Sequence, residues 1–223
     1  MVERQLVRRG IRDEAVLAAM GTVPRELFVP ADIQADAYRD DALPIASGQT
    51  ISQPYIVARM TELLAPRPGM RVLEVGTGSG YQAAVLATIG CDVTSIERHP
   101  DLAETARARL VELGLERNVR IEVGDGSLGW PDGAPFEGII VTAAAPRVPS
   151  TLRSQLADGG RLVVPVGTSR SQELVGVMRT GNSFDERLFG RCVFVPLVGA
   201  EGFEIVPAPD NPRDGGTNPA VGQ

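Results

Sequence analysis

Two repeating patterns of apolar and polar residues divide most of the chain into predicted strands and helices. Short apolar runs typical of buried strands occur at 71–75, 92–96, 119–123, 137–143 and 160–167. Segments with helical spacing separate most of these runs, at 80–90, 100–114 and 150–156. Strands that alternate with helices indicate an α/β fold, in which a mostly parallel sheet has helices on both faces.

Two further apolar runs, 172–180 and 191–198, follow each other without a helix between them. A parallel pair would need a long crossover connection, so we expect these two strands to be antiparallel. They would complete a seven-stranded, mostly parallel sheet.

The pattern is different at both ends of the chain. Residues 1–70 begin with two predicted helices, the first ended by Gly10 and the second capped by Asp13, and continue as irregular, proline-containing chain. Residues 201–223 are rich in Pro, Gly and Asn without periodicity, which indicates a flexible tail. We expect one domain over 1–200, composed of an N-terminal helical extension at 1–70 and the sheet at 71–200.

Composition and charge limit the expected partners. The chain has 223 residues, 43% of them hydrophobic, with no apolar run near the length of a membrane span and no signal peptide in its charged first ten residues. Its net charge is -6 and its basic residues are scattered, which is unfavourable for nucleic-acid binding. We expect a soluble cytoplasmic protein without membrane or nucleic-acid partners, and a monomer.

Few side chains are available for acid–base or covalent chemistry. The chain has no lysine, which excludes Schiff-base chemistry and a P-loop lysine. The one histidine, His99, is expected in a solvated loop, which disfavours a Ser-His-Asp hydrolase. Cys91 and Cys192 lie far apart in apolar surroundings, so we expect two buried thiols and no metal site.

A glycine-rich turn follows the first strand of the predicted sheet. Gly76, Gly78 and Gly80 allow close approach of the backbone to a ligand, although Tyr81 stands where a dinucleotide fingerprint has its third glycine. Glu97 ends the second strand about 20 residues later, where a carboxylate can accept hydrogen bonds from both ribose hydroxyls. An ordinary strand-to-helix turn would explain the glycines alone, but glycines with this acid favour a nucleotide-type ligand.

Asp125 and Gly126 follow the third strand and reach the same edge of the sheet. Asp125 could accept a hydrogen bond from an adenine amino group, or could equally be a simple turn residue. The acidic residues Glu74, Glu97 and Asp125 would repel a pyrophosphate and tolerate a sulfonium. S-adenosylmethionine has ribose and adenine without phosphate, so it is the ligand that this pattern favours.

The polar stretch GQTISQP (48–54) precedes an amphipathic helical run, with Ser52 expected at the N-cap and Pro54 in the first turn. Its apolar face comprises Ile56, Met60, Leu63 and Leu64. Capping alone, worth about 1 kcal/mol, would explain Ser52. However, a helix N-terminus also attracts anions, so a substrate carboxylate could be held there by N–H groups and the Ser52 and Thr50 hydroxyls.

Together these motifs resemble the protein-L-isoaspartate O-methyltransferase family. The glycine-loop segment (72–87) and the Glu97 segment (95–110) are shared by many methyltransferases, whereas TISQP and FVPL (194–197) are more specific. The remaining matching segments are 23–30, 48–64, 118–146 and 155–167. They occur in family order over nearly the whole chain to about residue 200.

This resemblance implies a Rossmann-like class I methyltransferase fold and transfer of a methyl group from S-adenosylmethionine to the α-carboxylate of L-isoaspartyl residues in damaged proteins and peptides. The ester would collapse to a succinimide that reopens partly to normal aspartate, which is a repair reaction. A carboxylate is already ionised at neutral pH, so the reaction needs alignment and no general base. Residues 1–70 would form the substrate side and 71–200 the cofactor side.

The same resemblance assigns the expected site residues. The expected catalytic residues are Ser52 and Thr50. The expected cofactor-binding residues are Glu74, Gly76, Thr77, Gly78, Gly80, Tyr81, Glu97, Arg98, Asp125, Gly126 and Thr142. Two positions depart from the family pattern, Glu137 where aspartate is commoner and Ser47 where glycine is frequent.

Three other functions stay open from the sequence. A methyltransferase acting on a small molecule would share every cofactor residue, although TISQP disfavours it. A nucleotide-dependent oxidoreductase is disfavoured by the missing third glycine and the acidic site. A protein that binds S-adenosylmethionine without turnover would keep the pocket and differ only in an assay.

Overall fold

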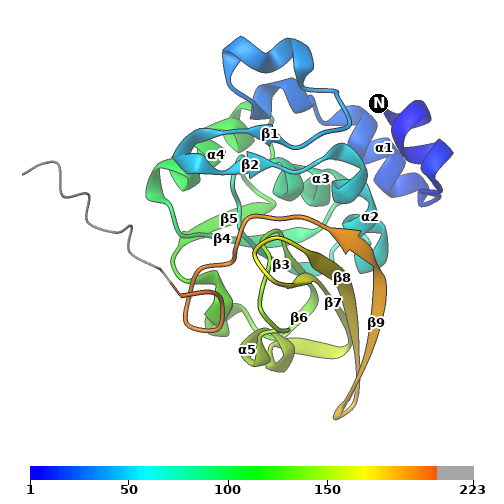
Figure 1. Cartoon of the computed structure of the whole chain (residues 1–223), viewed down its shortest axis with the longest axis vertical. Coiled ribbons are helices and arrows are strands. Elements are labelled where there is room, and N and C mark those ends of the chain that lie inside the picture. Colours follow the sequence, from blue (N-terminus) through cyan, green and yellow to red (C-terminus); the bar gives the residue numbers. More distant parts are fainter. Residues whose placement is uncertain (205–223) are drawn as a thin grey trace, which may run out of the picture.

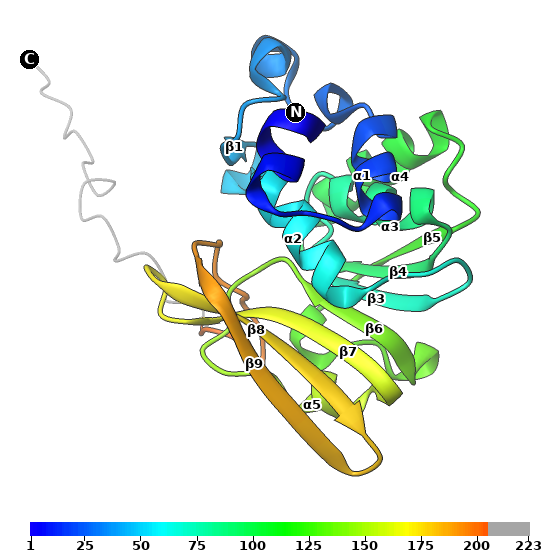
Figure 2. The same cartoon turned by 90° about the vertical axis from the view of Figure 1, so that its right-hand side faces the viewer.

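A twisted seven-stranded sheet forms the centre of the molecule in a computed structural model that describes residues 1–204 (Figures 1 and 2). Its strands are β3 (Arg71–Val75), β4 (Asp92–Glu97), β5 (Val119–Val123), β6 (Phe136–Val141), β7 (Leu156–Gly167), β8 (Gln172–Thr180) and β9 (Ser183–Cys192). The spatial order is β5-β4-β3-β6-β7-β8-β9, and β8 is antiparallel to both of its neighbours. The predicted α/β class and mostly parallel sheet are confirmed.

Helices cover both faces of this sheet. They are α1 (Glu14–Thr22), α2 (Pro54–Leu64), α3 (Tyr81–Ile89), α4 (Pro100–Glu112) and α5 (Ser150–Ser154). Figure 2 shows α1–α4 on one side of the sheet and α5 on the other. Successive strand residues point to opposite faces, so Val72 packs in the core beneath α1–α4 and Leu73 in the core beneath α5.

The strand order reverses between β3 and β6. From β3 the chain moves outward through β4 to β5, and it then returns to β6 on the other side of β3. In open α/β sheets a ligand crevice forms outside the carboxyl ends of the strands at such a reversal. The glycine loop after β3 and the residues after β6 therefore face a common crevice.

The N-terminal residues form short helical turns and a small hairpin on the α1–α4 side. A turn of π-helix (Val2–Leu6) and one of 3-10 helix (Val7–Arg9) end at Gly10 with φ +96°, and Asp13 accepts a hydrogen bond from the Val16 N–H at 3.0 Å. Further 3-10 turns cover Arg25–Phe28 and Ala31–Asp36. The chain then forms the hairpin β1 (Leu43–Pro44) and β2 (Thr50–Ile51). The predicted ends at Gly10 and Asp13 are confirmed.

The predicted last strand, 191–198, is wrong. The strand β9 begins at Ser183, directly after the two-residue turn Gly181–Asn182, and ends at Cys192. It is an edge strand with mostly exposed polar side chains, which protect an edge against aggregation but remove the apolar signal. Residues 193–198 are apolar for a different reason, because they leave the sheet and cross its carboxyl edge, where Ala144 forms a bridge with Pro196.

The described chain continues beyond the expected end of the domain. The Ala200 N–H donates to Asp125 Oδ2 at 2.7 Å, and the Glu201 carboxylate accepts hydrogen bonds from the N–H groups of Ser150 and Thr151. Residues 200–204 are thus tied to the sheet edge and to α5, whereas the rest of the expected tail, 205–223, lies outside the described residues. Within residues 1–204 no helix combines the length and apolar character needed to span a membrane.

Candidate functional site

One cleft opens at the carboxyl edge of the sheet, between the β3 and β6 loops. Strand β2, the start of α2 and the segment 194–198 complete its walls. The predicted residues that line it are Thr50, Ser52, Glu74, Gly76, Thr77, Gly78, Tyr81, Glu97, Arg98, Gly126 and Thr142. Gly80 and Asp125, also predicted for this site, lie outside the lining.

Gly76 and Gly80 have different roles in the glycine loop. Gly76 has φ +96°, and a Cβ there would lie 2.5 Å from Thr142 Oγ1, which donates to the Gly76 carbonyl. Gly80 has φ +89°, and a Cβ there would lie 3.1 Å from the Cβ of Ala106 in α4. Gly80 therefore lets α3 begin in close contact with α4, and its predicted contact with the cofactor stays a prediction.

Glu97 joins the glycine loop to the β4 loop. Its side chain is buried, Oε2 accepts from the Gly78 N–H at 2.8 Å, and Oε1 accepts from the His99 N–H at 3.0 Å. Each carboxylate oxygen has a second lone pair, so Glu97 keeps acceptor capacity toward the cleft. This arrangement agrees with the predicted acceptor for ligand hydroxyls.

Glu74 lies deeper in the cleft and is fully buried. Its Oε2 accepts a hydrogen bond from Ser95, which is itself bonded to Thr77, whereas Oε1 has no partner among the described residues. Burial raises the pKa of Glu74 to about 8, the Ser95 hydrogen bond opposes this shift, and the nearby Glu97 charge adds to it. The raised pKa favours the protonated form of Glu74 near neutral pH when no ligand is bound.

Asp125 uses both carboxylate oxygens within the protein. Oδ1 accepts from the N–H and the hydroxyl of Ser127, and Oδ2 accepts from the Ala200 N–H. It caps the short turn Gly126–Leu128 and holds the C-terminal segment, while Gly126 beside it lines the cleft. These bonds give Asp125 the turn role, while Oδ2, with one partner, keeps a lone pair, so the predicted acceptor role toward an adenine amino group stays a prediction.

The TISQP stretch departs from its expected helix-cap geometry. Helix α2 begins at Pro54 and its N-cap residue is Gln53, so the prediction of Ser52 as the N-cap is wrong. The first helical hydrogen bond runs from the Val57 N–H to the Gln53 carbonyl, which leaves Ser52 one residue outside the helix. Ser52 is half-buried, and its hydroxyl has no hydrogen-bond partner among residues 1–204. It lines the cleft beside the exposed Thr50.

Two further parts of the cleft were missed or misplaced. Residues 194–198, expected within the strand 191–198, form a wall of the cleft itself. His99, expected in solvent, is half-buried and lines the cleft next to Glu97. Its position directly after a parallel strand was the available signal, because loops at carboxyl ends of such strands meet at one edge.

Other sequence features lie away from the cleft. Cys91 and Cys192 are buried and unbridged as predicted, and burial raises the pKa of both thiols to about 11. Glu137 lies near the start of β6, at the end of the strand away from the cleft. It pairs with Arg67 at 2.6 Å and accepts a hydrogen bond from the Arg71 N–H. No cluster of His, Cys, Asp or Glu in the described chain could hold a metal ion.

The cleft thus combines a close-approach glycine loop, two buried carboxyls with spare acceptor capacity and hydroxyls without protein partners. Comparison with known proteins agrees with these features. The family model described as protein-L-isoaspartate(D-aspartate) O-methyltransferase matches residues 1–202. A protein-L-isoaspartate O-methyltransferase of Methylorubrum populi is 60% identical over 206 residues, covering 91% of this chain and 96% of the relative. One of Methanoregula boonei is 54% identical over 204 residues, with 92% and 94% covered.

Solved structures give the same result. A protein-L-isoaspartate O-methyltransferase superimposes with a TM-score of 0.80 at 31% identity, covering 91% of this chain and 67% of the other. A putative protein-L-isoaspartate O-methyltransferase from Plasmodium falciparum, in complex with S-adenosyl-L-homocysteine, gives a TM-score of 0.75 at 26% identity, with 88% and 96% covered. The predicted resemblance is confirmed, and the chain belongs to the protein-L-isoaspartate(D-aspartate) O-methyltransferase family.

Proposed function

We propose that this protein transfers a methyl group from S-adenosylmethionine to the α-carboxylate of L-isoaspartyl residues, using Ser52 and Thr50 to hold that carboxylate. The family supports the reaction. The observation that supports the residue roles is the position of these two side chains, which line both the cleft and an adjoining open groove. That groove runs between residues 40–42, the start of α2 and residues 191–195. A peptide in the groove would thus meet a cofactor in the cleft at Ser52.

The cleft residues fit the cofactor in chemical type. The backbone of Gly76 in the cleft lining and the spare acceptors of Glu97 suit the methionine and ribose portions of S-adenosylmethionine. The unpartnered Oε1 of Glu74 can interact with the positive charge of the ligand. A positive charge nearby stabilises the ionised carboxylate, so binding would favour loss of the Glu74 proton. We propose Thr77, Gly78, Tyr81, Arg98, Gly126 and Thr142 as the remaining cofactor contacts. Asp125 would support them through the segment it holds.

The chain's own residues need to do little acid–base work. The bound cofactor supplies an activated methyl group, and the substrate carboxylate is already ionised at neutral pH. Neutral hydroxyls at Thr50 and Ser52 can orient that carboxylate without neutralising it, so most of the rate gain would come from alignment. The half-buried His99 is not required for proton transfer in this scheme.

Methyl transfer to an isoaspartyl peptide tests this function directly. Incubation with S-adenosylmethionine labelled in its methyl group should give a base-labile ester, released as volatile methanol. Base-stable label would indicate methylation of nitrogen or carbon and would contradict the proposal. Binding of a nicotinamide nucleotide in place of S-adenosylmethionine would instead favour the oxidoreductase alternative.

We further propose a monomeric, cytoplasmic enzyme whose substrates are isoaspartyl-containing proteins and peptides. The net charge of -6 supports the absence of a nucleic-acid partner. Light scattering at micromolar concentration should give the mass of one chain, and a mass of two chains would contradict the monomer.

A further inference from the structure

A buried arginine lies directly behind Ser52. Arg25, in the 3-10 turn Arg25–Phe28, is 0% exposed. Its Nη2 donates to the Ser52 carbonyl at 2.7 Å, and its Nε donates to the Ala37 carbonyl at 2.8 Å. The guanidinium thus fixes the backbone of the residue whose hydroxyl faces the cleft.

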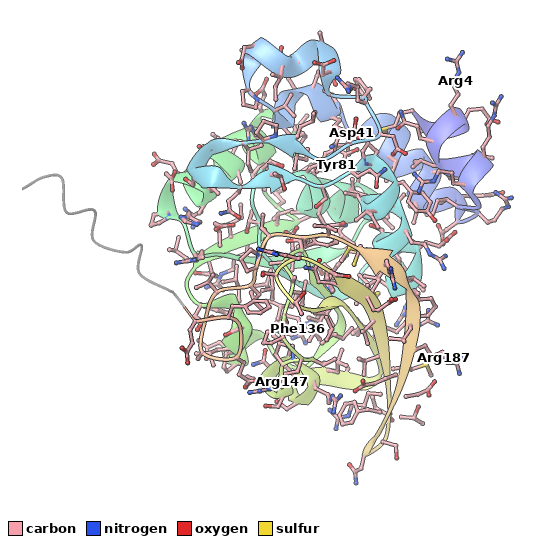
Figure 3. All side chains as sticks on the ribbon, viewed as in Figure 1. Arg4, Asp41, Tyr81, Phe136, Arg147 and Arg187 are labelled. Atoms are coloured by element: carbon pink, nitrogen blue, oxygen red, sulfur yellow. The ribbon has the colours of Figure 1, made fainter. Side chains whose placement is uncertain are left out.

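The same guanidinium contacts the cofactor side of the cleft. It lies 4.8 Å from the centre of the Tyr81 ring, and Tyr81 begins α3 directly after the glycine loop. Phe28 packs edge-on against the same Tyr81 ring, with the two ring centroids 5.3 Å apart. In the view of Figure 3, Tyr81 is seen just below the β1–β2 hairpin. Arg25 therefore connects the Ser52 segment to the helix that follows the glycine loop.

The incomplete pairing of buried Arg25 lowers the stability of the folded protein. Arg25 Nη1 is buried and has no hydrogen-bond partner within residues 1–204. A buried donor without a partner costs about 1–3 kcal/mol, and more when it is charged. Burial lowers the pKa of Arg25 while Tyr81 and Asp40 oppose this shift, but an arginine side chain keeps its charge in proteins. An apolar residue in this space would leave the Ser52 and Ala37 carbonyls without these donors, but a neutral donor could serve them without a buried charge, so the charge itself requires an explanation.

We propose that Arg25 is a positioning residue for methyl transfer, which holds the Ser52 backbone in place and keeps a positive charge behind the substrate carboxylate. This inference rests on the proposed function. The hydroxyls of Ser52 and Thr50 would contact the anion, while Arg25 would attract it from behind them. A direct ion pair would lower the nucleophilicity of the carboxylate, and the buried position of Arg25 avoids that contact.

Two substitutions and one matched control test this role. Arg25→Met fills the space without charge or donors, and Arg25→Lys keeps the charge but lacks the planar fork that reaches two carbonyls. Arg107→Met is the control, because Arg107 also donates to a backbone carbonyl, that of Ile121 at 2.7 Å, far from the cleft. Each variant is assayed for kcat/KM on an isoaspartyl peptide, for affinity to S-adenosyl-L-homocysteine by calorimetry, and for thermal unfolding.

The expected results differ between the variants. Arg25→Met should lower kcat/KM about 30-fold or more, corresponding to loss of a charged hydrogen bond, while affinity for S-adenosyl-L-homocysteine changes less than about 3-fold. Arg25→Lys should fall between Arg25→Met and the parent, and Arg107→Met should match the parent. If Arg25→Met does not fold, the test rests on Arg25→Lys, whose kcat/KM should be lower than that of the parent by about 5-fold or more.

Three outcomes would overturn the role of Arg25. They are parental kcat/KM in folded Arg25→Met, parental kcat/KM in Arg25→Lys when Arg25→Met does not fold, and an equal loss of cofactor affinity and kcat/KM. The last outcome would show a general structural role. A parent protein that transfers no methyl group would refute the proposed function first, so the two failures are distinguishable.

Discussion

At the scale of single residues, the cleft depends on side chains whose polar atoms have few partners in the protein. Glu74 Oε1 and Arg25 Nη1 are buried without a hydrogen-bond partner in the described chain, and the half-buried Ser52 lines the cleft. Native proteins pair most buried polar groups, so exceptions that gather at one site indicate ligand binding or catalysis. Each of these atoms therefore leads to a separate prediction.

Ser52→Ala should lower kcat/KM on an isoaspartyl peptide by about 100-fold, because one preorganised donor to the reacting group is lost. Affinity for S-adenosyl-L-homocysteine should stay unchanged. Ser183→Ala, at the exposed start of β9, is the matched control. A parental rate in Ser52→Ala would refute the catalytic role of this hydroxyl.

Glu74→Gln should change how stability depends on pH. The raised pKa of about 8 means that the folded protein binds a proton which the unfolded chain releases above about pH 4.5. The resulting stabilisation is complete below pH 4.5 and is lost as pH rises through 8. In urea unfolding without ligand, the variant should gain stability relative to the parent between pH 6 and pH 9.

The neutral amide explains this expected gain, because it carries no charge to bury at high pH. Glu104→Gln, at an exposed position in α4, is the control for the exchange of a carboxyl for an amide. A difference between Glu74→Gln and the parent that stays constant from pH 6 to pH 9 would contradict the raised pKa.

The sequence predicted the residue types of the site better than their roles. Gly76 and Glu97 lie where the strand-end pattern places them, because a parallel sheet brings these loops to one edge. Ser52 was taken as a helix cap because Pro54 follows closely, but proline at the first helical position makes Gln53 the N-cap. One partner of Asp125, Ser127, is local, but the other, Ala200, is 75 positions away, and no local pattern reveals such a contact.

At the scale of elements, α5 and the C-terminal segment stabilise each other. The Glu201 carboxylate accepts hydrogen bonds from the N–H groups of Ser150 and Thr151 and from both hydroxyls. An acidic side chain at a helix N-terminus satisfies free N–H groups and complements the helix dipole. The cap for α5 thus comes from a distant part of the chain.

Glu201→Gln should cost about 1 kcal/mol at pH 7, the usual value of an N-terminal cap. Burial disfavours the Glu201 charge, but hydrogen bonds from Thr151 and Ser150 outweigh it and lower the pKa. The stabilisation is therefore present above the unfolded pKa and disappears as pH falls through the folded value. Urea unfolding should show a difference at pH 7 that shrinks toward pH 3, and an equal difference at both would contradict the cap.

Element prediction succeeded where packing produces periodicity. The five buried parallel strands and helices α3 and α4 were located to within a few residues. The strand β9 was displaced because only one of its residues is buried, so tertiary hydrogen bonding forms a strand without an apolar pattern. The segment 193–198 shows the opposite case. It lies along the sheet edge outside any strand, but its apolar sequence has the same pattern as a buried strand.

At the scale of the whole molecule, the cleft lies between the carboxyl edge of the seven-stranded sheet and segments outside that sheet. The β3 and β6 loops form one wall, which we propose as the cofactor side, while the hairpin β1–β2 and the segment 194–198 form the other, which we propose as the substrate side (Figure 1). The alternation of strands and helices predicted this α/β class. The strand order could not be obtained from periodicity alone, because it depends on which strands pair across long sequence separations.

A chain ending at residue 204 should keep the fold, cofactor affinity and activity of the parent, because it keeps the whole sheet, helices α1–α5 and all the residues that line the cleft. A chain ending at residue 196 should bind S-adenosyl-L-homocysteine more weakly. It would lose Leu197 and Val198 from the cleft wall and Glu201 from α5. Calorimetry on both proteins would measure this, and equal affinity would contradict the role of residues 197–204.

The central claim is that this enzyme recognises the isoaspartyl carboxylate at Ser52 and Thr50. The most direct measurement is methyl transfer from labelled S-adenosylmethionine to two peptides that differ only in L-isoaspartate or L-aspartate at one site. The account predicts base-labile methyl ester on the isoaspartyl peptide alone. Equal labelling of both peptides, or of neither while the protein still binds S-adenosylmethionine, would contradict it.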